Sequence, residues 1–246
     1  MRRISITTVL LAGAALPLAL TACSSGGSSS AGAAQPATHT PAVSASPEDP
    51  NKRLATGAQL KTALAPASFF GPGYAVDVSA TRDSGPMYQE PSSAPASPAK
   101  LDCTKLAGTS WITITGDAGV SFAQTDYTNK NTSAEMAQEI DVFRKAIAPT
   151  ILNHLKNAVA ACPTFKDEDT KTTAKVKGTK TPGLGDEAYT ITVTDPAWQN
   201  GSTLIAVRRG TAVVTVLSTA GHDNGAASAK KLAAHVAAAL GTKAKG

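Results

Sequence analysis

The sequence predicts an α+β domain in which an antiparallel β-sheet is flanked by a long kinked helix and a C-terminal helix. Three patterns support this. Residues 171–218 contain several segments that alternate apolar and polar side chains, residues 132–162 carry an apolar stripe, and residues 226–240 are rich in alanine. A period of two is typical of strands, and spacings of three and four are typical of helices. Strands that follow one another in sequence favour an antiparallel sheet.

The first part of the folded region predicts short elements. Thr56 is a suitable N-cap for a helix over 56–64, in which Leu60 and Leu64 lie one turn apart. The proline-rich segment 84–100 is typical of a surface loop. We expect strands at 74–81, 111–115 and 120–127 and a short helix at 101–106 that carries Cys103.

The clearest helix pattern spans residues 132–162. Thr132 and Glu135 form a capping box, in which a hydroxyl side chain precedes a glutamate by three residues. Pro149 has no backbone N–H, so we expect it to kink this helix or divide it in two. The apolar stripe behind the cap consists of Met136, Ile140, Phe143, Ile147, Ile151, Leu155, Val159 and Cys162.

Beyond Pro163 the period changes to two. The segments 203–208 and 211–218 are joined at Arg209 and Gly210, and strands this close in sequence form an antiparallel hairpin. The alanine-rich helix that follows is expected to end at Gly241. Further strands are expected at 171–177 and 188–194.

The N-terminal segment is typical of a bacterial lipoprotein. Arg2 and Arg3 precede an uncharged apolar run, and Leu-Thr-Ala at 20–22 precedes Cys23 as in a lipobox. We expect residues 1–22 to be a signal peptide and Cys23 to carry acyl chains such as palmitate, which hold the protein to the outer face of the cell membrane. The alternatives are an ordinary signal peptide with a chance cysteine and an uncleaved anchor helix.

Composition divides the rest of the chain in two. Residues 23–50 hold Ser, Gly, Ala, Thr and Pro with almost no large apolar side chain, which favours a flexible tether. Residues 51–246 are long enough for one domain with its own core. The predicted location is therefore extracytoplasmic.

Cysteine count and charge give two further expectations. With Cys23 lipidated, Cys103 and Cys162 remain as an even pair in an oxidising compartment, which favours a disulfide over two buried thiols. The formal net charge is only +5, without a Lys/Arg block, so we expect no nucleic-acid partner.

Four sequence patterns bear on catalysis and on cofactor or metal binding. Residues 183–188, Gly-Leu-Gly-Asp-Glu-Ala, mimic a dinucleotide fingerprint, but a predicted strand follows them instead of a helix. The acidic run 167–169 lacks the glycine and final glutamate of a calcium loop. The four histidines show no zinc spacing, and no Gly-x-Ser-x-Gly elbow occurs. We therefore expect no cofactor, no metal and no enzymatic activity.

Aromatic residues make up only 4% of the chain, so each is informative. Core packing is the simplest role for them, and lining a cleft over the sheet is the alternative. Trp198 lies in a predicted loop, where aromatic side chains more often bind ligands. The candidate ligand-binding residues are Trp198, Tyr189, Arg208 and Arg209; the other aromatic residues considered are Phe69, Phe70, Tyr74 and Trp111.

Several segments occur in an order that resembles a family of actinobacterial cell-surface domains. The family is typified by the extracellular sensor domain of PknH-type serine/threonine kinases, and stand-alone lipoproteins also carry it. A related group of short actinobacterial lipoproteins shares the glycine turn and the hairpin. The resembling segments are 59–64, 101–103, 160–162, 183–188, 207–210 and the alanine-rich helix.

The resemblance implies an antiparallel sheet flanked by helices, with a cleft suited to an unidentified ligand, and it supplies no catalytic residues. This sequence has one cysteine pair where the kinase sensor has two disulfides. It shows no kinase domain or transmembrane helix beyond its leader, so we expect any signal to pass through a partner protein.

Together these patterns predict a membrane-anchored extracytoplasmic lipoprotein. Its sensor-like domain is expected to bind an unidentified small molecule, lipid or cell-wall fragment. One alternative is a protein-interaction or envelope-scaffold module without a small ligand, which an exposed apolar patch would favour. The other is a hydrolase acting on envelope material, which converging titratable groups in a concave site would favour.

Overall fold

The computed structural model describes residue 49 and residues 51–90, 101–145 and 147–243, all of which belong to the unit Pro47–Gly246. The predicted signal peptide, Cys23 and nearly all of the predicted tether lie outside the described residues. No helix of the described segments is both long and apolar enough to cross a membrane.

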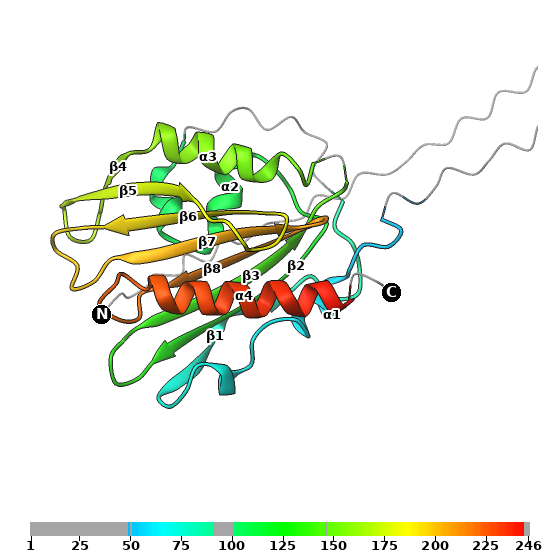
Figure 1. Ribbon diagram of the computed structural model, residues 1–246, viewed down its shortest axis with the longest axis horizontal. Helices are drawn as coiled ribbons and strands as arrows, with labels where there is room; N and C mark the ends of the chain where they lie inside the picture. Colours follow the sequence, from blue (N-terminus) through cyan, green and yellow to red (C-terminus); the bar gives the residue numbers. More distant parts are fainter. Residues whose placement is uncertain (1–48, 50, 91–100, 146, 244–246) are drawn as a thin grey trace, which may run out of the picture. The chain divides into compact units, whose positions relative to one another are not determined.

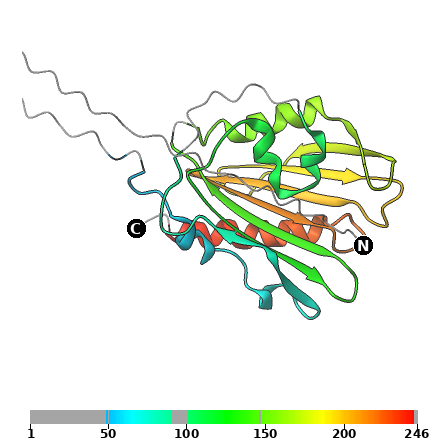
Figure 2. The same ribbon diagram turned by 180° about the vertical axis from the view of Figure 1, so that it is seen from behind.

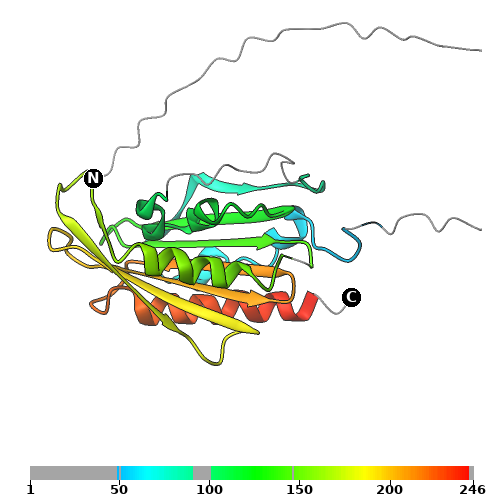
Figure 3. The same cartoon turned by 90° about the horizontal axis from the view of Figure 1, so that it is seen from above.

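Eight strands form one sheet in which every neighbouring pair is antiparallel. The order across the sheet is β1-β2-β3-β8-β7-β6-β5-β4, so β1 and the short β4 are the two edges. Figure 3 shows the cyan β1 and the yellow β5 toward opposite edges of the sheet. The strands are β1 (Tyr74–Asp83), β2 (Ser121–Asn129), β3 (Glu135–Val142), β4 (Thr164–Lys166), β5 (Thr173–Lys180), β6 (Glu187–Thr194), β7 (Ser202–Arg209) and β8 (Ala212–Ser218).

Helices cover both faces of this sheet. Helix α4 (Ala226–Lys243) packs on one face through Leu232 and Val236, and the short α1 (Gly57–Lys61) joins the same core cluster. Helix α3 (Ile151–Ala161) packs on the opposite face. The two opposite views agree, because α4 lies in front of the sheet in Figure 1 and behind it in Figure 2.

The central strands β7 and β8 are apolar on both sides because both faces are covered. In β8, Val214 belongs to the α4-side core, whereas Val213 belongs to the α3-side core. All residues of β8 are buried. The α+β class and the packing of the C-terminal helix on an antiparallel sheet are thus confirmed.

The predicted long kinked helix over 132–162 is wrong. Residues 135–142 are strand β3, paired with β2 and β8, and only residues 151–161 are helical. Met136 and Ile140 face one side in either structure, since a spacing of four fits both periods. The capping box does not form either: Ser133 has a φ of 57° in the β2–β3 turn, and the Glu135 N–H donates to Thr219 Oγ1.

The predicted strand at 111–115 is also wrong. A 3₁₀ turn, η3 (Thr109–Trp111), leads into the single-turn helix α2 (Ile112–Thr115), which ends at Gly116 with φ 75°. This turn buries the Trp111 ring fully and lets its Nε1 donate to Thr215 Oγ1 at 3.0 Å. Tertiary burial thus overrides the strand propensity of the β-branched residues.

The predicted disulfide is present between Cys103 and Cys162, whose Cα atoms are 5.6 Å apart. Cys103 begins the 3₁₀ helix η2 (Cys103–Ala107), and Cys162 follows the last residue of α3. The bond therefore ties the end of α3 to a segment 59 residues earlier.

Candidate functional site

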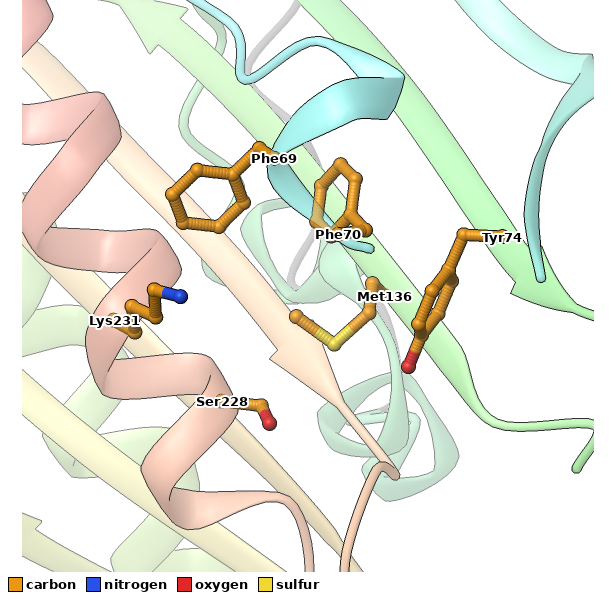
Figure 4. A pocket seen from close by; sticks show the side chains of 6 residues that line it. All are labelled: Phe69, Phe70, Tyr74, Met136, Ser228 and Lys231. Atoms are coloured by element: carbon orange, nitrogen blue, oxygen red, sulfur yellow. The ribbon is translucent and has the colours of Figure 1, made fainter. Parts of the chain in front are cut away.

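A depression with three aromatic side chains in its lining lies on the α4 side of the sheet. It has a volume of ≈ 90 Å³ and lies where the 3₁₀ turn η1 (Ala67–Phe69), β1, β3 and α4 meet. Figure 4 shows Lys231 and Ser228 on the α4 side and the aromatic rings on the other side, with Met136 between them. The lining residues are Phe69, Phe70, Tyr74, Met136, Ser228 and Lys231.

The aromatic wall is held by ring contacts. Phe70 lies 5.2 Å from Phe69, 5.7 Å from Tyr74 and 4.3 Å from Tyr127, measured between ring centroids. Tyr127 is buried beneath this wall and its hydroxyl donates to the carbonyl of Ala65 at 3.1 Å. Phe69, Phe70 and Tyr74 remain partly exposed, so the depression offers apolar surface that the core does not use.

Helix α4 supplies the polar rim. Ser228, Lys231 and His235 follow spacings of three and four and so share one helix face. The Lys231 ammonium lies 5.3 Å from the Phe69 ring centroid, and the His235 ring lies 4.6 Å from it. No described carboxylate lies within salt-bridge distance of Lys231. The rim therefore places a cation beside apolar surface.

The structure places Trp198 on the other side of the sheet. Trp198 is half-buried against the α3-side core, and its Nε1 donates to Asp167 Oδ2 at 2.9 Å. Asp167 also accepts from the N–H groups of Asp169 and Thr170, at 2.8 and 3.1 Å. Trp198 thus has a structural role in joining the β6–β7 loop to the β4–β5 loop.

The other predicted ligand-binding residues do not converge with Trp198. Tyr189 packs against the α3-side core, and Arg208 pairs with Asp186 at 3.0 Å. Arg208 lies opposite Glu187 at the start of β6, whereas Trp198 follows the end of that strand, about 20 Å away by the rise of a strand. Arg209 is exposed and approaches Gly241 of α4.

A second, open hollow lies in the turn between β5 and β6, with a volume of ≈ 400 Å³ and a lining of residues 180–188 alone. Gly183 and Gly185 have φ of 83° and 59°, which favour glycine, and strand β6 follows. The strand predicted to follow this motif is confirmed. The turn and the adjoining ends of β5 and β6 make up the whole lining of this hollow.

An acidic cluster lies on the α3 side of the sheet over β2 and β3, with Glu139 and Asp141 buried and Asp126 half-buried. In cross-strand register, Gln124 faces Glu139, and Phe122 faces Asp141. The nearest cation is Arg82 of β1, whose Nε donates to Gln124 Oε1 at 3.0 Å. The acidic cluster consists of three carboxyl side chains on this face, Asp126, Glu139 and Asp141.

Burial raises the pKa of each carboxyl in this cluster. The pKa of Asp126 rises to about 6, mainly by desolvation. Desolvation likewise raises the pKa of Glu139, although a hydrogen bond from Thr109 opposes it. Asp141 is 8% exposed and its Oδ2 has no hydrogen-bond partner, so desolvation and then the charge of Glu139 raise its pKa further.

The acidic cluster can take up protons at a higher pH than ordinary carboxyls do, but its members line neither depression. Within the described residues, no group of three or more His, Cys, Asp and Glu side chains is arranged to hold a metal ion. His154, which forms a 2.6 Å contact with Asp117, lies apart on α3.

Comparison of the sequence with models of protein families and with curated proteins found no match.

Sequence reasoning missed Met136, Ser228 and Lys231 as site residues. The helix predicted over 132–162 includes Met136, which the structure places on β3. The alanine-rich helix did contain a signal, because Ser228, Lys231 and His235 share one face. That face could not be linked to Phe69 and Phe70 without the tertiary fold.

Proposed function

We propose that this protein is a lipid-anchored, extracytoplasmic binding domain of the sensor type. Its depression between η1, β1, β3 and α4 takes up an apolar part of a ligand from the cell envelope. The observation that carries this proposal is the gathering of three partly exposed aromatic side chains, Phe69, Phe70 and Tyr74, around one hollow.

The size of the hollow limits what it holds. Ligand sites for drug-sized molecules occupy about 300–1,000 Å³, and a cavity of about 150 Å³ holds one benzene ring. A depression of ≈ 90 Å³ therefore takes the end of a chain or part of a ring, while the rest of the ligand stays outside.

The Cys103–Cys162 disulfide supports the extracytoplasmic location, because disulfides persist in oxidising compartments. Anchoring through acyl chains on Cys23 rests on the lipobox alone. The resemblance to the PknH-type sensor domain motivates a binding function, with the signal passed to a partner protein.

The test is mass spectrometry of the protein purified from the membranes of its own host. The intact mass should show an N-terminal Cys23 with acyl chains, and extraction should yield a stoichiometric small molecule. Ser228→Phe, which fills the depression, should lose that molecule. Trp198→Ala serves as the comparison on the opposite side of the sheet.

The outcomes separate the candidate sites. A molecule lost in Ser228→Phe and kept in Trp198→Ala places the ligand in the depression, whereas the reverse result supports the Trp198 site. A protein that carries no molecule in any form contradicts ligand binding. Near-ultraviolet circular dichroism of both variants checks that they remain folded.

An interaction module is the second candidate, and one observation favours it. The large apolar side chains that are exposed among the described residues all belong to edge strand β1 or follow it closely. Val76 is 41% exposed, Val78 83% and Met87 73%. An edge strand with exposed apolar side chains offers a surface for another chain.

A further inference from the structure

We infer that the ligand of the depression is an amphiphile with one apolar chain and an anionic head group. This inference rests on the proposed function, because it names the chemistry of the same site. Three features of the rim and floor carry it.

The first feature is the position of Lys231. Its ammonium lies 5.3 Å from the Phe69 ring centroid, at the border between the apolar wall and solvent. Among the described residues it has no carboxylate partner within salt-bridge distance. An anion placed there would gain a charge-assisted hydrogen bond without displacing an existing ion pair.

The second feature is the charge of the whole helix. Helix α4 carries Lys230 and Lys231 and contains no acidic residue. The Ser228 hydroxyl, one turn before Lys231, lines the same hollow and is available as a hydrogen-bond donor. The rim thus favours an anion over a cation.

The third feature is the floor. Met136 is 3% exposed and lies between the aromatic wall and α4, so the bottom of the hollow is apolar (Figure 4). A flexible thioether adapts to chains of different shape. An acyl chain whose end contacts Met136 would leave its head group level with Lys231.

The test compares two probes of equal chain length below their micelle concentrations, decanoate and decyltrimethylammonium, by isothermal titration calorimetry. The full chain carries Cys23→Ser, so that no acyl chain of its own competes. Decanoate should bind about fivefold more tightly than the cation at low salt, and added salt should reduce this preference. Lys231→Gln should remove the preference. Lys230→Gln, at the neighbouring position of the same helix, should retain it.

Two results would overturn the inference in distinguishable ways. If Ser228→Phe abolishes binding of both probes while Lys231→Gln affects neither, the depression binds apolar chains and only the anionic class is wrong. If neither probe binds, or Ser228→Phe changes neither affinity, both the ligand class and the proposed site fail.

A parallel measurement distinguishes the source of the amphiphile. Lys231-dependent binding to phosphatidylglycerol vesicles, and not to phosphatidylcholine vesicles, identifies a membrane lipid. Binding of decanoate without binding to either vesicle identifies a free amphiphile. Both results uphold the anionic head group, and equal binding to the two kinds of vesicle contradicts it.

Discussion

Two buried carboxyls, in different regions on the same side of the sheet, differ in how many hydrogen bonds they accept. In the β4–β5 loop, Asp167 is 5% exposed and accepts three hydrogen bonds, from Trp198, Asp169 and Thr170. Over β2 and β3, Asp141 is 8% exposed and its Oδ2 accepts none. Burial of Asp167 is therefore balanced by local donors, whereas burial of Asp141 is not.

The difference follows from the backbone that carries each group. Loops present free N–H groups, so Asp167 can accept from residues two and three positions later. In a strand the N–H groups are engaged in the ladder, and Asp141 depends on side chains of neighbouring strands. Its cross-strand neighbours are Phe122 and Val213, which donate nothing. The pKa of Asp141, in the middle of the sheet, is therefore raised well above its ordinary value.

The largest expected effect concerns the disulfide, which anchors the loop region five residues before Asp167. Replacing both cysteines (Cys103→Ser and Cys162→Ser) should lower the free energy of unfolding by up to about 4 kcal/mol, since the bond closes a long loop in the unfolded chain. Urea denaturation followed by circular dichroism measures this. Chemical reduction of the native protein should give a similar loss, and an unchanged midpoint in both cases would contradict the prediction.

The acidic cluster should make the domain less stable as the pH rises. Asp126 has an ordinary pKa of 3.8 when unfolded and about 6 when folded, so the folded state binds more protons between these values. Its contribution is fully present below pH 3.8 and is lost as the pH rises through about 6. With allowance for solvent screening, the loss is on the order of 2 kcal/mol.

Urea titrations between about pH 4.5 and 7.5 measure this slope while avoiding the acid range where ordinary carboxylates protonate. Asp126→Asn should flatten the slope. Glu168→Gln, which removes an exposed carboxylate near Asp167, is the matched control and should leave the slope as it is. A stability that rises with pH over this range would refute the prediction.

The sequence predicts the strands β6–β8, the C-terminal helix and the disulfide better than it predicts the region of β3. The strands β6, β7 and β8, the C-terminal helix and the disulfide follow from local periodicity and cysteine count, and the structure confirms them. Strand β3 could not be recognised, because Met136 and Ile140 fit a helix equally well and because Glu139 and Asp141 looked like the polar side of that helix. Pairing decides between a helix and a strand here. One partner, β2, lies across a turn, and the other, β8, is distant in sequence.

The depression could not be predicted from the sequence for the same reason, because one of its residues lies on β3. The scarcity of aromatic residues draws attention to Phe69, Phe70 and Tyr74. Their partner Met136 falls in a wrongly predicted helix, and Lys231 belongs to no motif. A depression formed by four separate segments has no signature in any one of them. Trp198, by contrast, has the expected loop position, yet its indole N–H is engaged by Asp167.

The smallest expected effect tests whether Trp198 is structural or binds a ligand. Trp198→Phe keeps a ring against the core but removes the hydrogen bond to Asp167, which should cost about 1 kcal/mol of unfolding free energy. A double-mutant cycle with Asp167→Asn measures the coupling of the two side chains. A coupling near zero would mean that the hydrogen bond contributes nothing to stability, and Trp198 would then again be a candidate for ligand binding. A clear coupling would mean that Trp198 stabilises the contact between the two loops. The aromatic depression on the α4 side would then remain the candidate binding site.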